Sequence, residues 1–346
     1  MPEYLSTAPS YSNEAQRQSS GYELQPGQTL DGRFLITDVI SKSGMATVFK
    51  ATDLVTGHEV AIKVPFLQYE SDPGFFSRFV QEGKIGERLD HPYILKFIPF
   101  ENRSRPYLVT EYLHGHTLAY MLQCERPMPE KDALKLVSRI CEALTYLHGH
   151  DVIHRDLKPH NIMICPDDTI RLMDFGIAKS IGRRFTFAGF TPAIGTPEYM
   201  APEQVRGKRG DERTDIYALG AMLYEMVVGV IPFTDGKGDV FAAMNARLTG
   251  DPVAPRKLNR ELSEQVEEII LHAMEREPGK RYPSAAAMQD DVDHPDRVQL
   301  TGRWQRLQSP APWKRQLKNA LWIALVLGVI VFGFVQLILL IMRRGP

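Results

Sequence analysis

Cysteine is scarce in this chain, and neither sign of charge is in excess. The three cysteines, Cys124, Cys141 and Cys165, form no CxxC or Cys/His pattern, which excludes a disulfide scaffold and gives no indication of a zinc site. Lysine and arginine number 41 against 42 acidic residues, so the net charge of −1 provides no basic footprint for nucleic acid. We expect a protein of a reducing compartment that does not bind nucleic acid.

The composition as a whole is that of a folded protein. Hydrophobic residues make up 43% of the 346 residues and charged residues 24%. Glycine and proline follow no period, which excludes a collagen-like chain. The segment 1–29 has neither an apolar core nor the apolar run of a signal peptide, and we expect a flexible N-terminal arm there.

One long apolar run stands out in the last part of the sequence. Residues 320–342 have Gln336 as their only strongly polar member, and a helix of that length spans roughly 34 Å against a hydrocarbon core of roughly 30 Å. Trp322 lies near one end, as interfacial tryptophans do. A charge-free core helix of this length is unusual, so we expect one transmembrane helix and single-pass attachment to a lipid bilayer. A juxtamembrane linker over 293–319 precedes it, and a short basic tail, 343–346, follows.

Three small residues of this run, Ala320, Ala324 and Gly328, lie four positions apart. Such a stripe lets two membrane helices approach closely. A homodimer therefore stays open as an alternative to a monomeric anchor.

Within residues 30–292 the pattern changes near residue 114 from one typical of strands to one typical of helices. Strands are expected at 33–40, 46–51, 59–65, 94–100 and 106–111, with one helix at 75–89. Further helices are expected through 137–147 and at 212–229, 239–248, 263–274 and 284–292. We predict an α+β fold of two lobes with a ligand site in the cleft. The N-lobe, about 30–113, is small and β-rich, and the C-lobe, about 114–292, is larger and α-rich.

Four short motifs occur in order within this region. They are Val60-Ala61-Ile62-Lys63, the string His154-Arg155-Asp156-Leu157-Lys158-Pro159-His160-Asn161, Asp174-Phe175-Gly176 and Ala201-Pro202-Glu203. Each is weak alone, but together and in this order they match the protein kinase signature set. From about Arg33 to Val292 the chain resembles the bacterial eukaryotic-like serine/threonine protein kinases, and the resemblance implies the bilobal protein kinase fold.

The resemblance also implies roles for the motif residues, with ATP and Mg²⁺ as cofactors. Asp156 matches the base near the attacking hydroxyl, with Lys158 beside it in the catalytic loop. Lys63 matches the cation that holds the α- and β-phosphates. Asn161 and Asp174 match the two magnesium ligands, as hard cations prefer oxygen.

Lys63 needs a carboxylate partner to stay aimed at the phosphates. Glu82, nineteen residues on, fits the family's helix-C glutamate, and Glu87 is its rival. We favour Glu82 on spacing.

The phosphate-binding loop departs from the family's Gly-x-Gly-x-x-Gly-x-Val. In the stretch Ser41-Lys42-Ser43-Gly44-Met45-Ala46-Thr47-Val48, the glycine positions hold Ser41, Ser43 and Ala46. Glycine lets backbone approach phosphate in unusual conformations, so two interpretations remain: a relaxed working loop, or a weakened ATP site. The full set of expected ATP-binding residues is Ile40, Ser41, Lys42, Ser43, Gly44, Val48, Ala61, Lys63, Glu111, Leu113 and Met163.

Other matches concern substrate and regulation. Lys158 before Pro159, and Thr196, resemble the serine/threonine branch of the family. In that branch an arginine at the position of Arg155 often meets a phosphorylated activation-loop residue. We expect autophosphorylation at Thr191 or, as the alternative, Thr186.

The expected function is transfer of the ATP γ-phosphate to serine or threonine hydroxyls of protein substrates. Because the reaction uses cytosolic ATP and magnesium, the catalytic domain is placed in the cytoplasm. A pseudokinase-type membrane scaffold is the alternative, favoured by the altered glycine loop. A small-molecule kinase is opposed by the segment from Gly195 to Glu203, which such enzymes lack.

Overall fold

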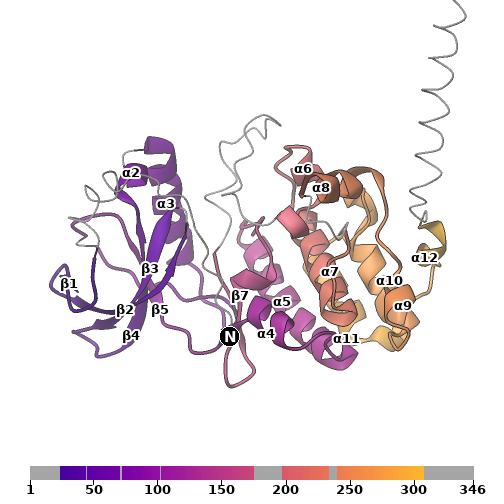
Figure 1. The fold of residues 1–346 in the computed structure, drawn as a ribbon, viewed down its shortest axis with the longest axis horizontal. Helices are drawn as coiled ribbons and strands as arrows, with labels where there is room; N and C mark the ends of the chain where they lie inside the picture. Colours follow the sequence, from indigo (N-terminus) through magenta and orange to yellow (C-terminus); the bar gives the residue numbers. More distant parts are fainter. Residues whose placement is uncertain are drawn as a thin grey trace, which may run out of the picture.

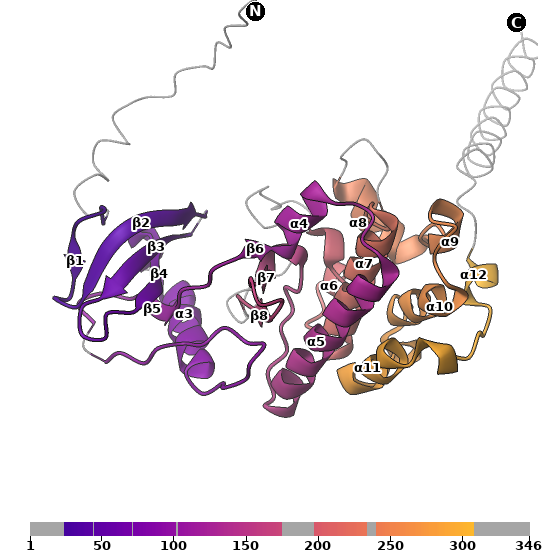
Figure 2. The same cartoon turned by 90° about the horizontal axis from the view of Figure 1, so that it is seen from below.

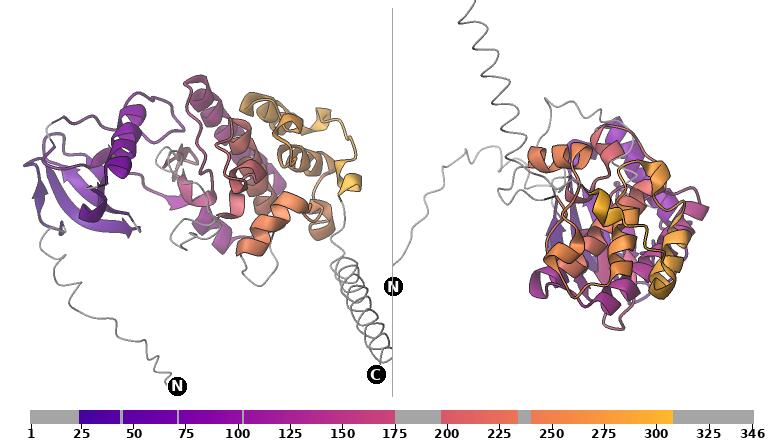
Figure 3. Two further views of the ribbon diagram at one scale, coloured as in Figure 1. Left: turned by 90° about the horizontal axis from the view of Figure 1, so that it is seen from above. Right: turned by 90° about the vertical axis from the view of Figure 1, so that its right-hand side faces the viewer.

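The molecule has two lobes, with strands gathered at one end and helices at the other (Figures 1 and 3). The computed structural model describes residues 24–43, 45–70, 72–101, 103–174, 197–233 and 240–307. In this described part of the chain, no helix is long and apolar enough to cross a bilayer. The predicted membrane helix at 320–342 lies outside the described residues, as does most of the predicted arm.

The N-lobe is an antiparallel sheet of five strands in the order β1-β2-β3-β4-β5, with α3 beside it. Its elements are β1 Thr29–Leu30, β2 Phe34–Lys42, β3 Ala46–Asp53, β4 Glu59–Pro65, α2 Leu67–Glu70, α3 Pro73–Gly86 and β5 Leu108–Glu111. Asp72 starts α3 by accepting hydrogen bonds from the backbone N–H groups of Gly74 and Phe75, and Pro73 takes the first helical turn. Phe75 and Phe79 on α3 are buried and belong to the same hydrophobic core cluster as Leu108 of β5.

The strand predicted at 94–100 is wrong: only isolated bridges form there. Ile94 bridges Leu172 of the C-lobe, whereas Phe97 bridges Thr110 of β5. The segment thus changes partners midway, and Pro99 has no N–H to continue a ladder. It serves as a link between the lobes.

The C-lobe is helical, and α7 runs through its centre (Figure 2). Its helices are α4 Leu118–Cys124, α5 Glu130–Gly149, α6 Pro202–Val205, α7 Arg213–Val228, α8 Val240–Thr249, α9 Pro255–Leu258, α10 Glu264–Ala273, α11 Ala285–Asp293 and α12 Arg303–Arg306, with 3-10 turns η1 Pro159–Asn161, η3 Pro197–Tyr199, η4 Pro278–Lys280 and η5 Pro295–Arg297. Every residue of α7 from Thr214 to Val227 is buried, as expected of a helix covered on all sides by α5, α10 and their neighbours. Gly220 permits the close approach, since a Cβ there would lie 2.7 Å from that of Ala273.

A small sheet lies between the lobes, beside α5 (Figure 2). It has the order β6-β7-β8, from β6 His116–Thr117, β7 Ile162–Ile164 and β8 Ile170–Leu172. Ile94, Phe97 and Leu108 of the N-lobe side belong to the same buried core as the C-lobe helices. The continuous core fixes where the two lobes face each other, and the candidate site lies there.

The first part of the predicted linker, residues 293–307, packs on the C-lobe. Glu268 of α10, 4% exposed, accepts hydrogen bonds at 2.5 Å from both the Thr301 hydroxyl and the Arg303 guanidinium. Arg303 also lies 3.4 Å from Glu275. These contacts anchor the chain to α10 as far as α12.

A buried ion pair joins the motif residue Glu203 to Arg281. The Nη1 and Nη2 nitrogens of Arg281 donate to the two carboxylate oxygens of Glu203 at 2.8 Å, and the Thr214 hydroxyl donates to the same carboxylate at 2.9 Å. The pair connects the chain between η4 and α11, which contains Arg281, to α6, which contains Glu203. Removing one partner leaves the other charge buried and uncompensated.

We therefore expect Arg281→Met to lower the free energy of unfolding by roughly 3–5 kcal/mol, measured by chemical denaturation. The neighbouring Lys280 forms an exposed pair with Glu277, and Lys280→Met is the matched control with an expected cost of about 1 kcal/mol or less. Equal effects of the two variants would contradict a structural role for the buried pair.

Candidate active site

Lys63 on β4 is held between two carboxylates from different lobes. Its Nζ lies 2.9 Å from Glu82 Oε1 on α3 and 3.0 Å from Asp174 Oδ1 directly after β8. Glu82 is buried, whereas 57% of the Asp174 side chain is exposed. Gly83 helps to bring α3 this close, because a Cβ at that position would lie 2.6 Å from the Leu108 side chain of β5.

The charges of this trio shift one another's pKa values. Burial disfavours a charged Lys63, but the carboxylates of Asp174 and Glu82 outweigh burial and raise its pKa above the usual range. The charge of Lys63 lowers the pKa of Asp174, and burial raises the pKa of Glu82. Lys63 therefore stays cationic at neutral pH, as holding a phosphate requires.

The alternative partner, Glu87, lies elsewhere. It follows the end of α3 and accepts a hydrogen bond at 3.0 Å from Arg103. Of the two glutamates that the sequence leaves open, the structure therefore pairs Glu82 with Lys63.

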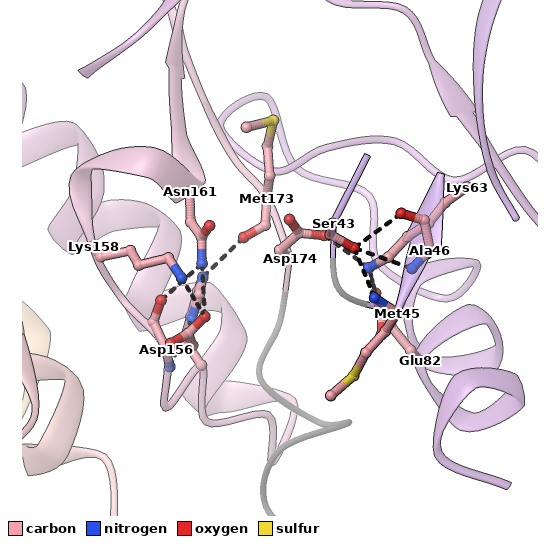
Figure 4. A network of polar contacts seen from close by, with 11 residues as sticks. Ser43, Met45, Ala46, Lys63, Glu82, Asp156, Lys158, Asn161, Met173 and Asp174 are labelled. Carbon is pink, nitrogen blue, oxygen red and sulfur yellow. Dashed lines mark hydrogen bonds and ion pairs between the residues drawn. The ribbon is translucent and has the colours of Figure 1, made fainter. Parts of the chain in front are cut away.

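The second group of site residues comes from the loop before β7. The Lys158 ammonium lies 3.0 Å from Asp156 Oδ2. The Asn161 amide donates to the Asp156 carbonyl at 2.8 Å and to its carboxylate at 3.3 Å. Figure 4 shows this group facing Lys63 and Glu82, with Asp174 between the two groups.

Asp215 on α7 binds the backbone of the catalytic loop at His154 and Arg155. It is fully buried, and its carboxylate accepts from the backbone N–H of His154 at 2.9 Å and of Arg155 at 2.7 Å. The His148 ring lies 2.9 Å from the same carboxylate. These bonds stabilise the backbone at Arg155, whose φ of 60° is rare for a residue other than glycine.

His154 connects the catalytic loop to the strand that ends at Asp174. Its ring Nε2 lies 3.0 Å from the carbonyl oxygen of Met173, and burial lowers its pKa, which favours the neutral ring. A neutral Nε2–H donor is the form that bonds a carbonyl. The two halves of the site thus keep a fixed spacing.

Several of the expected ATP-binding residues lie on strands of the N-lobe sheet and of the small sheet. Val48 lies opposite Lys63 in the β3–β4 ladder, and Ala61 opposite Thr110 in the β4–β5 ladder. Met163 comes from β7 of the other lobe. Of this group, Val48, Ala61, Leu113 and Met163 are half-buried, whereas Ile40 is 48% exposed.

The side chain of Glu111, one of the expected ATP-binding residues, is bonded within the protein itself. The carboxylate accepts from the Lys96 backbone N–H at 3.0 Å and from Arg171 of β8 at 3.3 Å. What this residue offers a nucleotide base is backbone only. Its side chain joins the segment between the lobes to the small sheet, a link that no local sequence pattern indicates.

The oxygen atoms of Asp174 and Asn161 fit a hard cation. Asn161 uses its amide nitrogen on Asp156, so the amide oxygen is the atom that can face a metal. Among the described residues, no cluster of three or more His, Cys, Asp or Glu forms a metal centre by itself. Nucleotide phosphates would have to supply the other ligands of a magnesium ion.

Several predicted residues cannot be compared with the structure. Gly44, Thr186, Thr191 and Thr196 lie outside the described residues. Ser41, Lys42 and Ser43 of the phosphate loop are described and exposed. No motif in the sequence indicates the hydrogen bonds that Ser43 makes within this loop.

Comparison with known proteins identifies the fold and the family. Residues 36–292 match the protein kinase domain model. The chain is 34% identical to the serine/threonine-protein kinase PknB of Mycobacterium leprae and 36% identical to PrkC of Bacillus subtilis, over 76% and 77% of its own length. It spans only 43% and 41% of those two relatives.

Among solved structures, the kinase domain of Mycobacterium tuberculosis PknI matches with a TM-score of 0.62 at 23% identity. The match covers 79% of this chain and all of that domain, and it shows the bilobal protein kinase fold. Together with the family match, the fold and the arrangement of Lys63, Glu82 and Asp174 lead to one conclusion: the chain belongs to the protein kinase family.

Proposed function

We propose that the protein is a membrane-anchored kinase that transfers the γ-phosphate of ATP to serine or threonine hydroxyls of proteins. The observation that carries the proposal is the contact of Lys63 with both Glu82 and Asp174 across the cleft. An ammonium aimed in this way, opposite a carboxylate and an amide oxygen, suits the triphosphate and its metal. The names of the relatives support the serine/threonine class.

The chemistry assigned to the chain's own residues follows from their contacts. Asp156 takes the proton of the substrate hydroxyl while the hydroxyl oxygen bonds to the γ-phosphorus and the bond to the β–γ bridging oxygen breaks. Lys158, 3.0 Å from Asp156, stabilises the charge near the transferred group. Lys63 orients the phosphates, and Asn161 and Asp174 would hold Mg²⁺, which neutralises charge on the bound ATP.

The proposed domain organisation keeps the boundaries expected from the sequence. A kinase domain covers 30–292, a linker covers 293–319, and a membrane helix covers 320–342, with the catalytic domain on the cytoplasmic side. The family match over 36–292 supports the first boundary pair. The contacts of Thr301 and Arg303 with Glu268 support a linker whose first part, as far as α12, packs on the C-lobe.

The test is phosphoryl transfer from radiolabelled ATP by the full chain in detergent micelles. Asp156→Asn removes the base, and we expect a rate loss of about 100-fold or more. Glu82→Gln leaves Lys63 with one charged partner, and we expect kcat/KM to fall about tenfold or more. Glu87→Gln is the matched control because its partner is Arg103, and its rate should stay within about twofold. Nucleotide binding without transfer by the parent chain would instead favour a pseudokinase-type scaffold.

A second prediction concerns activation. The Nε of Arg155 is buried and has no hydrogen-bond partner among the described residues, and burial, with the charge of Arg209, lowers its pKa. A guanidinium with a buried, unbonded Nε at this place suits a phosphorylated threonine. We propose that this residue is Thr191. Thr191→Ala should lower activity about tenfold, Arg155→Gln should do the same, and the double variant should lose little more.

The control for this prediction is Thr186→Ala, which should keep most of the activity. Phosphopeptide mapping of the active protein provides the direct measurement. An active protein without phosphate between residues 180 and 195 would contradict the proposal.

Membrane attachment gives a third prediction. The full chain in bacterial membranes should resist carbonate extraction because residues 320–342 span the bilayer. Leu327→Arg combined with Val331→Arg costs about 3 kcal/mol for each arginine near the bilayer centre and should release the protein. Gln336→Leu is the control and should remain in the membrane fraction. Release of the unaltered chain by carbonate would contradict the anchor.

A further inference from the structure

Ser43 bonds to its own loop in a way that glycine cannot. Its hydroxyl lies 2.9 Å from the Ala46 carbonyl oxygen, 3.1 Å from the Ala46 backbone nitrogen and 3.4 Å from the Met45 backbone nitrogen. The Ser43 backbone N–H also donates to the Ala46 carbonyl at 2.9 Å. The side chain thus closes the turn between β2 and β3 from within.

These contacts use the whole bonding capacity of one hydroxyl. A serine side chain has one O–H to donate and two lone pairs to accept. Here the O–H donates to the Ala46 carbonyl, and the lone pairs accept from the N–H groups of Met45 and Ala46. The backbone N–H groups of Met45 and Ala46 are therefore both engaged by a neutral acceptor of the same loop.

The backbone N–H groups of Met45 and Ala46 lie near the residue that is expected to hold the phosphates. Ala46 begins β3, and Val48, two residues on, lies opposite Lys63 in the ladder. In Figure 4, Ser43, Met45 and Ala46 lie on the same side of the site as Lys63 and Glu82. Consecutive backbone N–H groups at a turn form a site for anions, and this turn adjoins the ammonium proposed to hold the phosphates.

We propose that Ser43 competes with the nucleotide phosphates for the backbone N–H groups of Met45 and Ala46, and so sets the nucleotide affinity of this kinase. The inference rests on the proposed function, because it needs ATP to bind in this cleft. When a phosphate binds, the hydroxyl must give up its bonds to the two amides. Phosphate binding therefore replaces the hydrogen bonds from the two amides to Ser43 instead of adding bonds to free amides. The free energy of the lost bonds is subtracted from the free energy of binding, which lowers the affinity.

Ser43→Ala tests this exchange directly. Alanine removes the acceptor, keeps the Cβ, and leaves the amides of Met45 and Ala46 for the ligand alone. The measurement is isothermal titration calorimetry of the full chain in detergent micelles with AMP-PNP and Mg²⁺, and separately with adenosine. AMP-PNP carries the phosphates that the amides would bind, and adenosine carries none.

We expect Ser43→Ala to lower the Kd for AMP-PNP about 3- to 10-fold and to leave the Kd for adenosine within about twofold. Ser43→Gly should have the same two effects as Ser43→Ala: a lower Kd for AMP-PNP and a Kd for adenosine within about twofold of the parent value. Thr37→Ala is the matched control, because the Thr37 hydroxyl donates to the Lys50 carbonyl at 3.1 Å in the same hairpin but farther from the loop. This control should change neither Kd.

Three results would overturn the proposal. An unchanged or weaker affinity for AMP-PNP in Ser43→Ala would show that the hydroxyl does not compete, or that it orders the loop for binding. Equal tightening of AMP-PNP and adenosine would place the effect away from the phosphates. If neither the parent chain nor any variant binds AMP-PNP, the proposed function fails, and the inference fails with it; binding of equal strength in all variants overturns the inference alone.

Discussion

The contact of Lys63 with Glu82 and Asp174 is the constraint on which the rest of the site depends. The ammonium comes from the sheet, one carboxylate from α3, and the other from the strand end of the C-lobe. All three elements must hold their positions for one cation to satisfy two acids. Any rotation of α3 away from the sheet would break the 2.9 Å bond to Glu82 and leave a buried carboxylate without a partner, which is costly. Gly83 permits the position of α3 in which this bond forms, because a Cβ there would lie 2.6 Å from the Leu108 side chain.

A second buried carboxylate organises the other half of the cleft. Asp215 receives two backbone N–H groups of the catalytic loop and contacts the ring of His148. Positive φ values at Arg155 and Asp174 carry a conformational cost, and each lies next to a residue held by this network. The bond of His154 to the Met173 carbonyl then sets the distance between the two halves. The strained backbone conformations at Arg155 and Asp174 are maintained because the hydrogen bonds of the buried residues Asp215 and His154 hold the adjacent backbone in place.

Local pattern was enough to predict much of this arrangement, and long-range pairing explains the rest. The strand at 59–65 and the helices at 212–229, 263–274 and 284–292 agree with β4, α7, α10 and α11 to within a residue or two, because each has a clear period and a clear stop. The strand expected at 94–100 does not form, since its two halves take partners in different lobes. The contacts of Glu268 with Thr301 and Arg303 also join residues more than thirty positions apart, and nothing in the local sequence indicates them. For the site, the kinase motifs supplied the residues, and the structure supplied their partners.

The altered glycine loop favours weak nucleotide binding, whereas the complete set of charged residues favours catalysis. The two observations are compatible because binding and catalysis are separate properties. Ser43 bonds to backbone amides at the loop, and none of its hydrogen bonds among the described residues reaches Lys63, Glu82 or Asp156. The effect that we propose for Ser43 is therefore on how strongly phosphates are held, a uniform contribution to binding. Lys63, Glu82 and Asp174 together leave one negative charge in excess, which suits a cation carried in with a nucleotide and which a scaffold without nucleotide has no use for. Retention of this charge arrangement beside a loop of lower affinity is what we expect of a kinase whose nucleotide binding is weakened and whose phosphoryl transfer is not.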